Sequence, residues 1–215
     1  MPFLSQLKKN NSREWMEQHR KDYEKAKADF LEFSNLLIQS IADFDASVGN
    51  LHAKNCVFRI NRDVRFSKDK SPYKTNMGVY INKNGKKGLG PGYYFHVEPG
   101  NIFIAVGIWM PEPEIVAKIR QEIDYEWKEW QKILSGASLK KHFPNGMDRS
   151  DTLVRAPKGY EEENPAIEHI KLKSFILRRT VGNDELKEIR FLDALTKCYQ
   201  STRLMMQFLE KAIDG

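Results

Sequence analysis

Three arginines and one aspartate occur at short intervals in one segment of the chain, and they are the side chains best suited to chemistry. These residues are Arg59, Arg62, Asp63 and Arg65. A guanidinium group is always charged, and its planar fork of donors matches carboxylate and phosphate oxygens. Asp63 can orient one arginine or accept a proton while another arginine stays available to a ligand. The spacing therefore indicates a cradle for an anion.

Two residues further along extend this candidate site. Lys70 continues the positive charge into the following loop, and Tyr73 adds a hydroxyl group and a flat ring. Between residues 54 and 93, which we call the basic segment, ten basic residues outnumber two acids. The segment carries a charge of +8 whereas the whole chain carries +6, so the rest of the chain is slightly acidic. The positive charge is thus confined to one region.

The basic segment has two functional interpretations. In the first, it binds a phosphate- or carboxylate-bearing small molecule, with Asp63 as base or orienting group and the glycine-rich loop at 85–92 as a cover. The binding residues of this interpretation are Arg59, Arg62, Arg65, Lys70 and Tyr73. In the second, the segment binds nucleic acid without catalysis, and the tyrosines near it stack on bases: Tyr73, Tyr80, Tyr93 and Tyr94. The residue types do not decide whether a reaction follows binding.

A structural interpretation has equal standing. Arg62 falls on an otherwise apolar face, so it can be tied to Asp63 or to backbone carbonyls. The acidic run at 161–163 can also neutralise the segment. In that case the charged network only holds the fold together.

Other motifs predict no metal and no cofactor. His96 and Glu98 stand two apart on an expected strand and face the same way, but a transition metal needs a third ligand, and none has a recognisable spacing. The 85–92 loop lacks the GK[ST] ending and the following helix of a nucleotide-binding loop. Cys56 and Cys198 fit no metal or redox spacing, and neither has a neighbouring histidine to activate it.

Apolar periodicity predicts long helices at both ends of the chain. Apolar residues recur in steps of three and four from Trp15 to Phe44, which predicts one helix of more than 30 residues after a short helix at 3–8. Asn11 and Glu14 have the spacing of a capping box for its start. A second long helix is expected from Asn183 or Asp184, with the following apolar positions turned inward: Leu186, Ile189, Leu195, Tyr199, Thr202, Met206, Leu209 and Ile213.

Alternation of apolar and polar residues predicts the strands. The expected strands are 56–66, 78–82, 93–98, 102–109 and 172–180. Pro99 and Gly100 suit the centre of a type II turn, so two of the strands form a hairpin. Isoleucines at 115, 119 and 123 and tryptophans at 127 and 130 predict two further helices, the second ending at Gly136.

These elements favour an α+β fold in which an antiparallel sheet packs against the long N-terminal and C-terminal helices. No linker divides the chain, so we expect a single domain over residues 1–215. Its parts are an N-terminal helical part at 1–48, strands with the basic motif at 52–110, helices and an irregular segment at 111–171, and a strand and C-terminal helix at 172–215.

Composition narrows the class of protein. Hydrophobic residues make up 40% of the chain, which provides the apolar surface of a folded core. No apolar run is long enough for a signal sequence or a membrane span, so we expect a cytoplasmic protein with no membrane partner. The sequence gives no indication of the oligomeric state.

The string RINRDVRF followed by DKSPY resembles the signature of a bacterial family of uncharacterised proteins, domain of unknown function 2461. The matching positions are Arg59, Arg62, Asp63, Arg65, Phe66, Asp69, Lys70, Pro72 and Tyr73. The opening FLSQLKKNNSREW, the strand GYYFHVEP and the turn RAPKGY are similar to other landmarks of that family. The resemblance spans nearly the whole chain and implies a shared fold or site. It implies no particular activity.

Overall fold

The computed structural model of the chain describes residues 1–65 and 68–215. The helices are α1 (Pro2–Lys9), α2 (Arg13–Gln18), α3 (Arg20–Ala42), α4 (Ala53–Cys56), α5 (Pro113–Tyr125), α6 (Trp127–Ser135), α7 (Ala137–His142), α8 (Ile167–Ile170), α9 (Phe191–Gln200) and α10 (Arg203–Asp214). The strands are β1 (Met77–Ile81), β2 (Gly92–Val97), β3 (Phe103–Ile108) and β4 (Phe175–Thr180). Short 3-10 turns occur at Ala46–Val48, Gly85–Lys87 and Glu185–Lys187.

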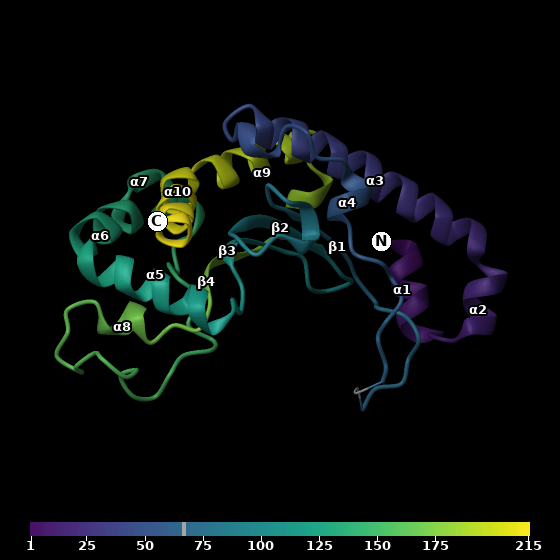
Figure 1. The fold of residues 1–215 in the computed structure, drawn as a ribbon. Helices are drawn as coiled ribbons and strands as arrows, with labels where there is room; N and C mark the ends of the chain where they lie inside the picture. The colour runs from purple at the N-terminus through teal and green to yellow at the C-terminus, as the bar shows by residue number, and fades with distance from the viewer. Residues whose placement is uncertain (66–67) are drawn as a thin grey trace. The chain divides into compact units, whose positions relative to one another are not determined.

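The strands form one antiparallel sheet in the order β1-β2-β3-β4 (Figure 1). The α+β prediction is therefore confirmed. The type II turn between β2 and β3 is present, because Gly100 has a φ of 82° and Asn101 N–H donates to Glu98 O at 3.0 Å. Within the described ranges, no helix has both the length and the apolar character needed to cross a membrane.

Two compact units divide the chain. The first comprises Met1–Lys87, Tyr94–Ile104 and Thr180–Ile189, and the second comprises Gly88–Tyr93, Ala105–Arg179 and Arg190–Gly215. That division does not test the single-domain expectation, which stays a prediction.

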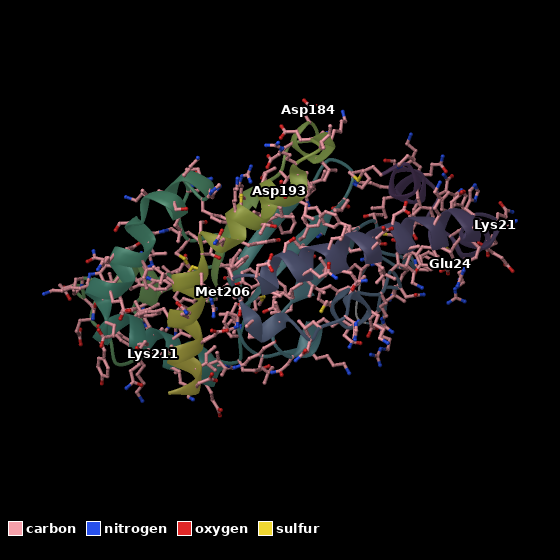
Figure 2. The ribbon with its side chains drawn as sticks, turned by 90° about the horizontal axis from the view of Figure 1, so that it is seen from above. Lys21, Glu24, Asp184, Asp193, Met206 and Lys211 are labelled. Carbon is pink, nitrogen blue, oxygen red and sulfur yellow. The ribbon has the colours of Figure 1, made fainter. Side chains whose placement is uncertain are left out.

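In the first unit, α3 packs on β2 through Phe33 and Phe95, whose ring centroids lie 5.3 Å apart. Figure 2 labels Lys21 and Glu24 near the amino-terminal end of this helix. A buried cluster joins α1 and α2 to the basic segment. Its buried members are Phe3, Leu4, Leu7, Met16 and Ile60. This cluster fixes the position of the arginine-rich part of the chain.

In the second unit, α10 packs against α5 and α6. The buried ring of Trp130 lies 4.8 Å from that of Phe208, centroid to centroid. Lys211, labelled on α10 in Figure 2, pairs with Glu122 of α5 at 2.8 Å. The predicted helix at 127–136 is confirmed, because α6 ends at Ser135 and Gly136 follows as its cap.

The prediction of one N-terminal helix from residue 11 to residue 44 is wrong. Ser12, not Asn11, caps α2, since its hydroxyl accepts a hydrogen bond from Trp15 N–H at 3.1 Å. The chain then departs from helical geometry at His19, between α2 and α3. The His19 ring stacks on Trp15 at 4.1 Å, and its Nδ1 lies 2.9 Å from Trp15 O. This local contact ends α2 although the apolar steps continue.

The prediction of a single long C-terminal helix is also wrong. Ser201 and Thr202 separate α9 from α10, and their hydroxyls donate to the carbonyls of Cys198 and Tyr199 at 2.6 and 2.7 Å. Side-chain hydroxyls that bond nearby carbonyls compete with helix continuation. Ile189, which was expected to point inward, lies before α9 and is fully exposed.

Candidate functional site

The arginine-rich segment is a loose hairpin, so the prediction of a regular strand from 56 to 66 is wrong. Where the structure describes this segment, its backbone pairs at isolated positions, such as Asn61 with Tyr73. Lys74 N–H donates to Ile60 O at 2.7 Å, and Arg62 N–H donates to Pro72 O at 2.9 Å. Phe66, which belongs to the motif and to the expected strand, lies outside the described residues.

Ile60 and Tyr73 hold this hairpin against the N-terminal helices. Ile60 is buried in the cluster formed by α1 and α2, and the Tyr73 ring packs against the same cluster. Asn11 also binds the Tyr73 backbone, donating to its carbonyl at 2.9 Å and accepting from its N–H at 3.2 Å. Tyr73 therefore anchors the hairpin, whereas the sequence had indicated a ligand-binding role.

Arg62 is engaged by residues on the opposite arm of the hairpin. Its guanidinium donates to the Asp69 carboxylate, and to Ser71 Oγ at 3.3 Å. Hydrogen bonds from the Ser71 hydroxyl and N–H, and then from Arg62, lower the pKa of Asp69 to about 2. The structural interpretation had tied Arg62 to Asp63 or to carbonyls. Its side chain instead bonds to Asp69 and Ser71.

Asp63 and Arg65 form a two-pronged pair. Arg65 Nε donates to one carboxylate oxygen at 3.0 Å, and Nη2 donates to the other at 2.6 Å. These side-chain bonds, and then the Arg65 backbone N–H, lower the pKa of Asp63. A carboxylate with a lowered pKa accepts a proton poorly at neutral pH. Its geometry suits orientation of Arg65 better than general base catalysis. Lys70 lies elsewhere and donates to Val64 O at 3.0 Å.

Arg59, Arg62 and Lys74 form a group of positive charges, which we call the cationic group. Lys74 is half-buried, and its ammonium lies 5.5 Å from the Phe58 ring centroid. Burial, and then the charges of Arg59 and Arg62, lower the pKa of Lys74. Within residues 1–65 and 68–215, the side chains of Arg59 and Lys74 pair with no carboxylate. Asp69 pairs with Arg62, and the charge of Arg59 helps to lower the pKa of Asp63, so Lys74 is the member of the group to which no described carboxylate is paired.

A row of aromatic and polar side chains borders the cationic group. The Phe58 ring lies 6.3 Å from that of Tyr94, whose hydroxyl is 2.9 Å from His96 Nδ1. His96 and Glu98 face the same way as predicted, with Nε2 and Oε2 3.7 Å apart. Thr75 donates to Glu98 at 2.7 Å. Among the described residues, no group of three or more His, Cys, Asp or Glu side chains could hold a metal ion.

The turn at 85–87 lies against residues 54–57 of the same unit. Lys86 Nζ donates to Val57 O at 2.7 Å and to Lys54 O at 3.3 Å. Gly85 has a φ of 68°, and a side chain there would meet Asn55 O at 3.0 Å. These contacts fasten the start of the glycine-rich loop to the chain before Arg59, so its role as a cover stays a hypothesis.

The structure thus places Arg59 and Arg62 near Lys74, whereas Lys70 donates to Val64 O and the Tyr73 ring packs against the cluster of α1 and α2. From the sequence, Lys74 was only one of the ten basic residues of the basic segment. The signal for it was present, since Phe58 and Lys74 lie on the two arms of one hairpin, but only the pairing of Ile60 with Lys74 reveals that they meet. The role of Asn11 had no comparable signal, because its partner is 62 residues away.

A family model described as conserved hypothetical protein (DUF2461) matches residues 1–208 of the chain. No curated protein and no solved structure gives a significant match.

Proposed function

The chain belongs to the family of conserved hypothetical proteins (DUF2461), and from its own geometry we propose that it binds a phosphate- or carboxylate-bearing small molecule at the cationic group. The ligand-contacting residues of this proposal are Arg59, Arg62 and Lys74. Asp63 and Arg65 form the adjoining pair, and Arg65 can rotate toward a bound anion while Asp63 sets its plane.

One observation supports this proposal above the others. Lys74 is half-buried beside two arginines, and the segment supplies no carboxylate to it. Like charges brought together in a partly desolvated place repel one another, and only other interactions keep them there. A bound anion relieves that repulsion and accepts charge-assisted hydrogen bonds from the guanidinium forks. Places of this kind are more common at functional sites than on ordinary surfaces.

Nucleic acid is the competing ligand, since it presents the same phosphate groups. That interpretation used tyrosines for base stacking, but the Tyr93 ring is buried and the Tyr73 ring packs in the cluster with α1. Fewer flat rings are then available for bases than the sequence indicated. A compact anion therefore suits the geometry better. We place this binding in the cytoplasm, because Cys56 and Cys198 are both free cysteines and form no disulfide.

The test is thermal unfolding in the presence of phosphate, pyrophosphate and citrate. Binding at a hundred times the dissociation constant stabilises a protein by about 2.7 kcal/mol, and the effect grows with the logarithm of the free anion concentration. We expect at least one of these anions to raise the melting temperature of the wild type, and Arg59→Gln and Lys74→Gln to lose that rise. The control is Lys87→Gln, which removes one charge from the same basic segment but not from the cationic group.

Two outcomes would contradict the proposal. If Lys87→Gln weakens the stabilisation as much as Lys74→Gln does, the anion responds to diffuse charge and not to a site. If no anion stabilises the protein while DNA binds with a steep dependence on salt, the nucleic-acid interpretation is correct.

A further inference from the structure

Three elements of the second unit bring a cysteine, a histidine and an arginine together. Cys198 lies on α9, His142 ends α7, and Arg179 lies on β4. Arg179 Nη1 donates to Cys198 Sγ at 3.2 Å, and His142 Nδ1 lies 3.2 Å from the same sulfur. The sequence had predicted no histidine beside either cysteine, and for Cys198 that prediction is wrong. The partner is 56 residues away in the chain.

This arrangement stabilises negative charge on the sulfur. The guanidinium of Arg179 is permanently cationic and donates directly to Sγ, and a thiolate accepts such a bond better than a thiol does. Burial, and then the charges of Lys141 and Arg179, lower the pKa of His142. The imidazole is therefore a weaker base than usual but is neutral at pH 7, and its Nδ1, 3.2 Å from the sulfur, is positioned to receive the thiol proton.

Cys56 provides a contrast within the same chain. It is fully buried on α4, and burial raises the pKa of its thiol, opposed only by the charge of Lys86. A thiol of that kind is inert. The two cysteines thus differ in their partners and not in their burial, because Cys198 is itself only 2% exposed.

We propose that Cys198 is a nucleophilic thiol that reacts with hydrogen peroxide, with His142 as the proton acceptor and Arg179 as the stabiliser of the thiolate. The low exposure of Cys198 restricts its partners to small molecules, which favours a peroxide over a bulky substrate. This inference is independent of the cationic group, whose residues all lie in the first unit.

The reaction consumes the Cys198 thiol and one peroxide molecule, and it gives a sulfenic acid and water. The thiol proton moves to His142, and the sulfur attacks one peroxide oxygen with its electron pair. An S–O bond forms while the O–O bond breaks, and the other oxygen leaves with the bonding pair and takes the proton from His142 as water. The sulfur is oxidised by two electrons to a sulfenic acid, and the peroxide is reduced.

The test compares the two cysteines of the folded wild-type protein. Hydrogen peroxide is added with dimedone, which traps sulfenic acids, and the adduct on each cysteine peptide is measured over time by mass spectrometry. The thiolate is the form of cysteine that attacks peroxide, and the hydrogen bond from Arg179 favours that form at Cys198. We therefore expect Cys198 to be modified about tenfold faster than Cys56, or more. Equal rates for the two cysteines would overturn the proposal.

Variants assign the roles of the two neighbours. Arg179→Gln and His142→Gln should each slow modification of Cys198 while leaving Cys56 unchanged. Arg178→Gln is the matched control, because alternate residues of a strand point to opposite faces. Each variant is checked for an unchanged far-ultraviolet spectrum. If a variant does not fold, the comparison of Cys198 with Cys56 in the wild-type protein still tests the proposal. Folded variants that react as fast as the wild type would remove His142 and Arg179 from the proposal.

Discussion

Asn11 binds the backbone of Tyr73 with both ends of its side-chain amide. Nδ2 donates to Tyr73 O at 2.9 Å, and Oδ1 accepts from Tyr73 N–H at 3.2 Å. The amide thus makes the two backbone hydrogen bonds that a neighbouring strand would make to Tyr73. Asn11 lies in the loop between α1 and α2. This contact joins the N-terminal helices to the arm of the hairpin that carries Lys74.

Replacing Asn11 should therefore destabilise the protein. Asn11→Ala leaves a partly buried N–H and carbonyl of Tyr73 without partners, and a group of that kind costs about 1–3 kcal/mol. We expect a loss of that size in the free energy of unfolding, measured with urea. Asn10→Ala is the control, since its side chain makes an exposed bond to Gln6 O. Equal effects of the two substitutions would show that the Tyr73 contact contributes nothing particular.

The proton affinity of Lys74 should report on the cationic group. Burial and the charges of Arg59 and Arg62 lower its pKa, so removing one of those charges should raise it. We expect Arg59→Gln to raise the pKa of Lys74 in the free protein, and phosphate to raise it in the wild type. Nuclear magnetic resonance of the lysine side chain measures both. A Lys74 pKa that phosphate leaves unchanged would place the bound anion elsewhere.

Gly107 occupies a position that no other residue can take. Its φ is 119°, and an added Cβ would lie 2.0 Å from Phe175 O on the neighbouring strand. Gly107→Ala should therefore unfold the second unit or lower its melting temperature strongly. Gly100→Ala is matched in backbone strain, with a φ of 82°, but a Cβ there meets nothing within 4 Å. We expect it to cost only about 1 kcal/mol. Similar losses of stability in the two variants would mean that backbone strain, and not the clash with Phe175 O, causes the effect at Gly107.

Local signals in the sequence predicted local features correctly. The Pro99-Gly100 turn and the end of α6 at Gly136 depend on residues within a few positions of each other. The same applies to β1, β2 and β3, whose bounds each differ from the expected ones by one residue. Turn chemistry and apolar alternation act over such distances, so one sequence suffices to read them.

Contacts between residues that are distant in the chain could not be predicted from the sequence. Apolar steps continue through His19 although its contact with Trp15 ends the helix. The motif showed that Arg62 would be charged, but not that Asp69 and Ser71 would engage it. The meeting of Cys198 with His142 and Arg179 depends on how α7, α9 and β4 pack. The spacing of residues along the sequence does not indicate how these elements pack.

His169 makes the stability of the second unit depend on pH. Trp130 Nε1 donates to His169 Nδ1 at 3.1 Å, and an indole N–H can only donate. A proton on Nδ1 would remove that acceptor. Burial, and then the charge of Arg149, lower the pKa of His169 to about 4 from the ordinary value of 6.5.

Between those two pH values the unfolded chain binds a proton at this histidine that the folded chain does not bind. The stabilisation is therefore complete above about pH 6.5 and is lost as the pH falls toward 4, by up to about 3 kcal/mol. Urea unfolding at several pH values should show this slope in the wild type. His169→Gln keeps an oxygen that can accept from Trp130 but does not titrate, so the difference between the two proteins isolates the histidine. Parallel pH profiles would show that folding leaves the pKa of His169 unchanged, and the stabilisation attributed to the neutral imidazole would then be absent.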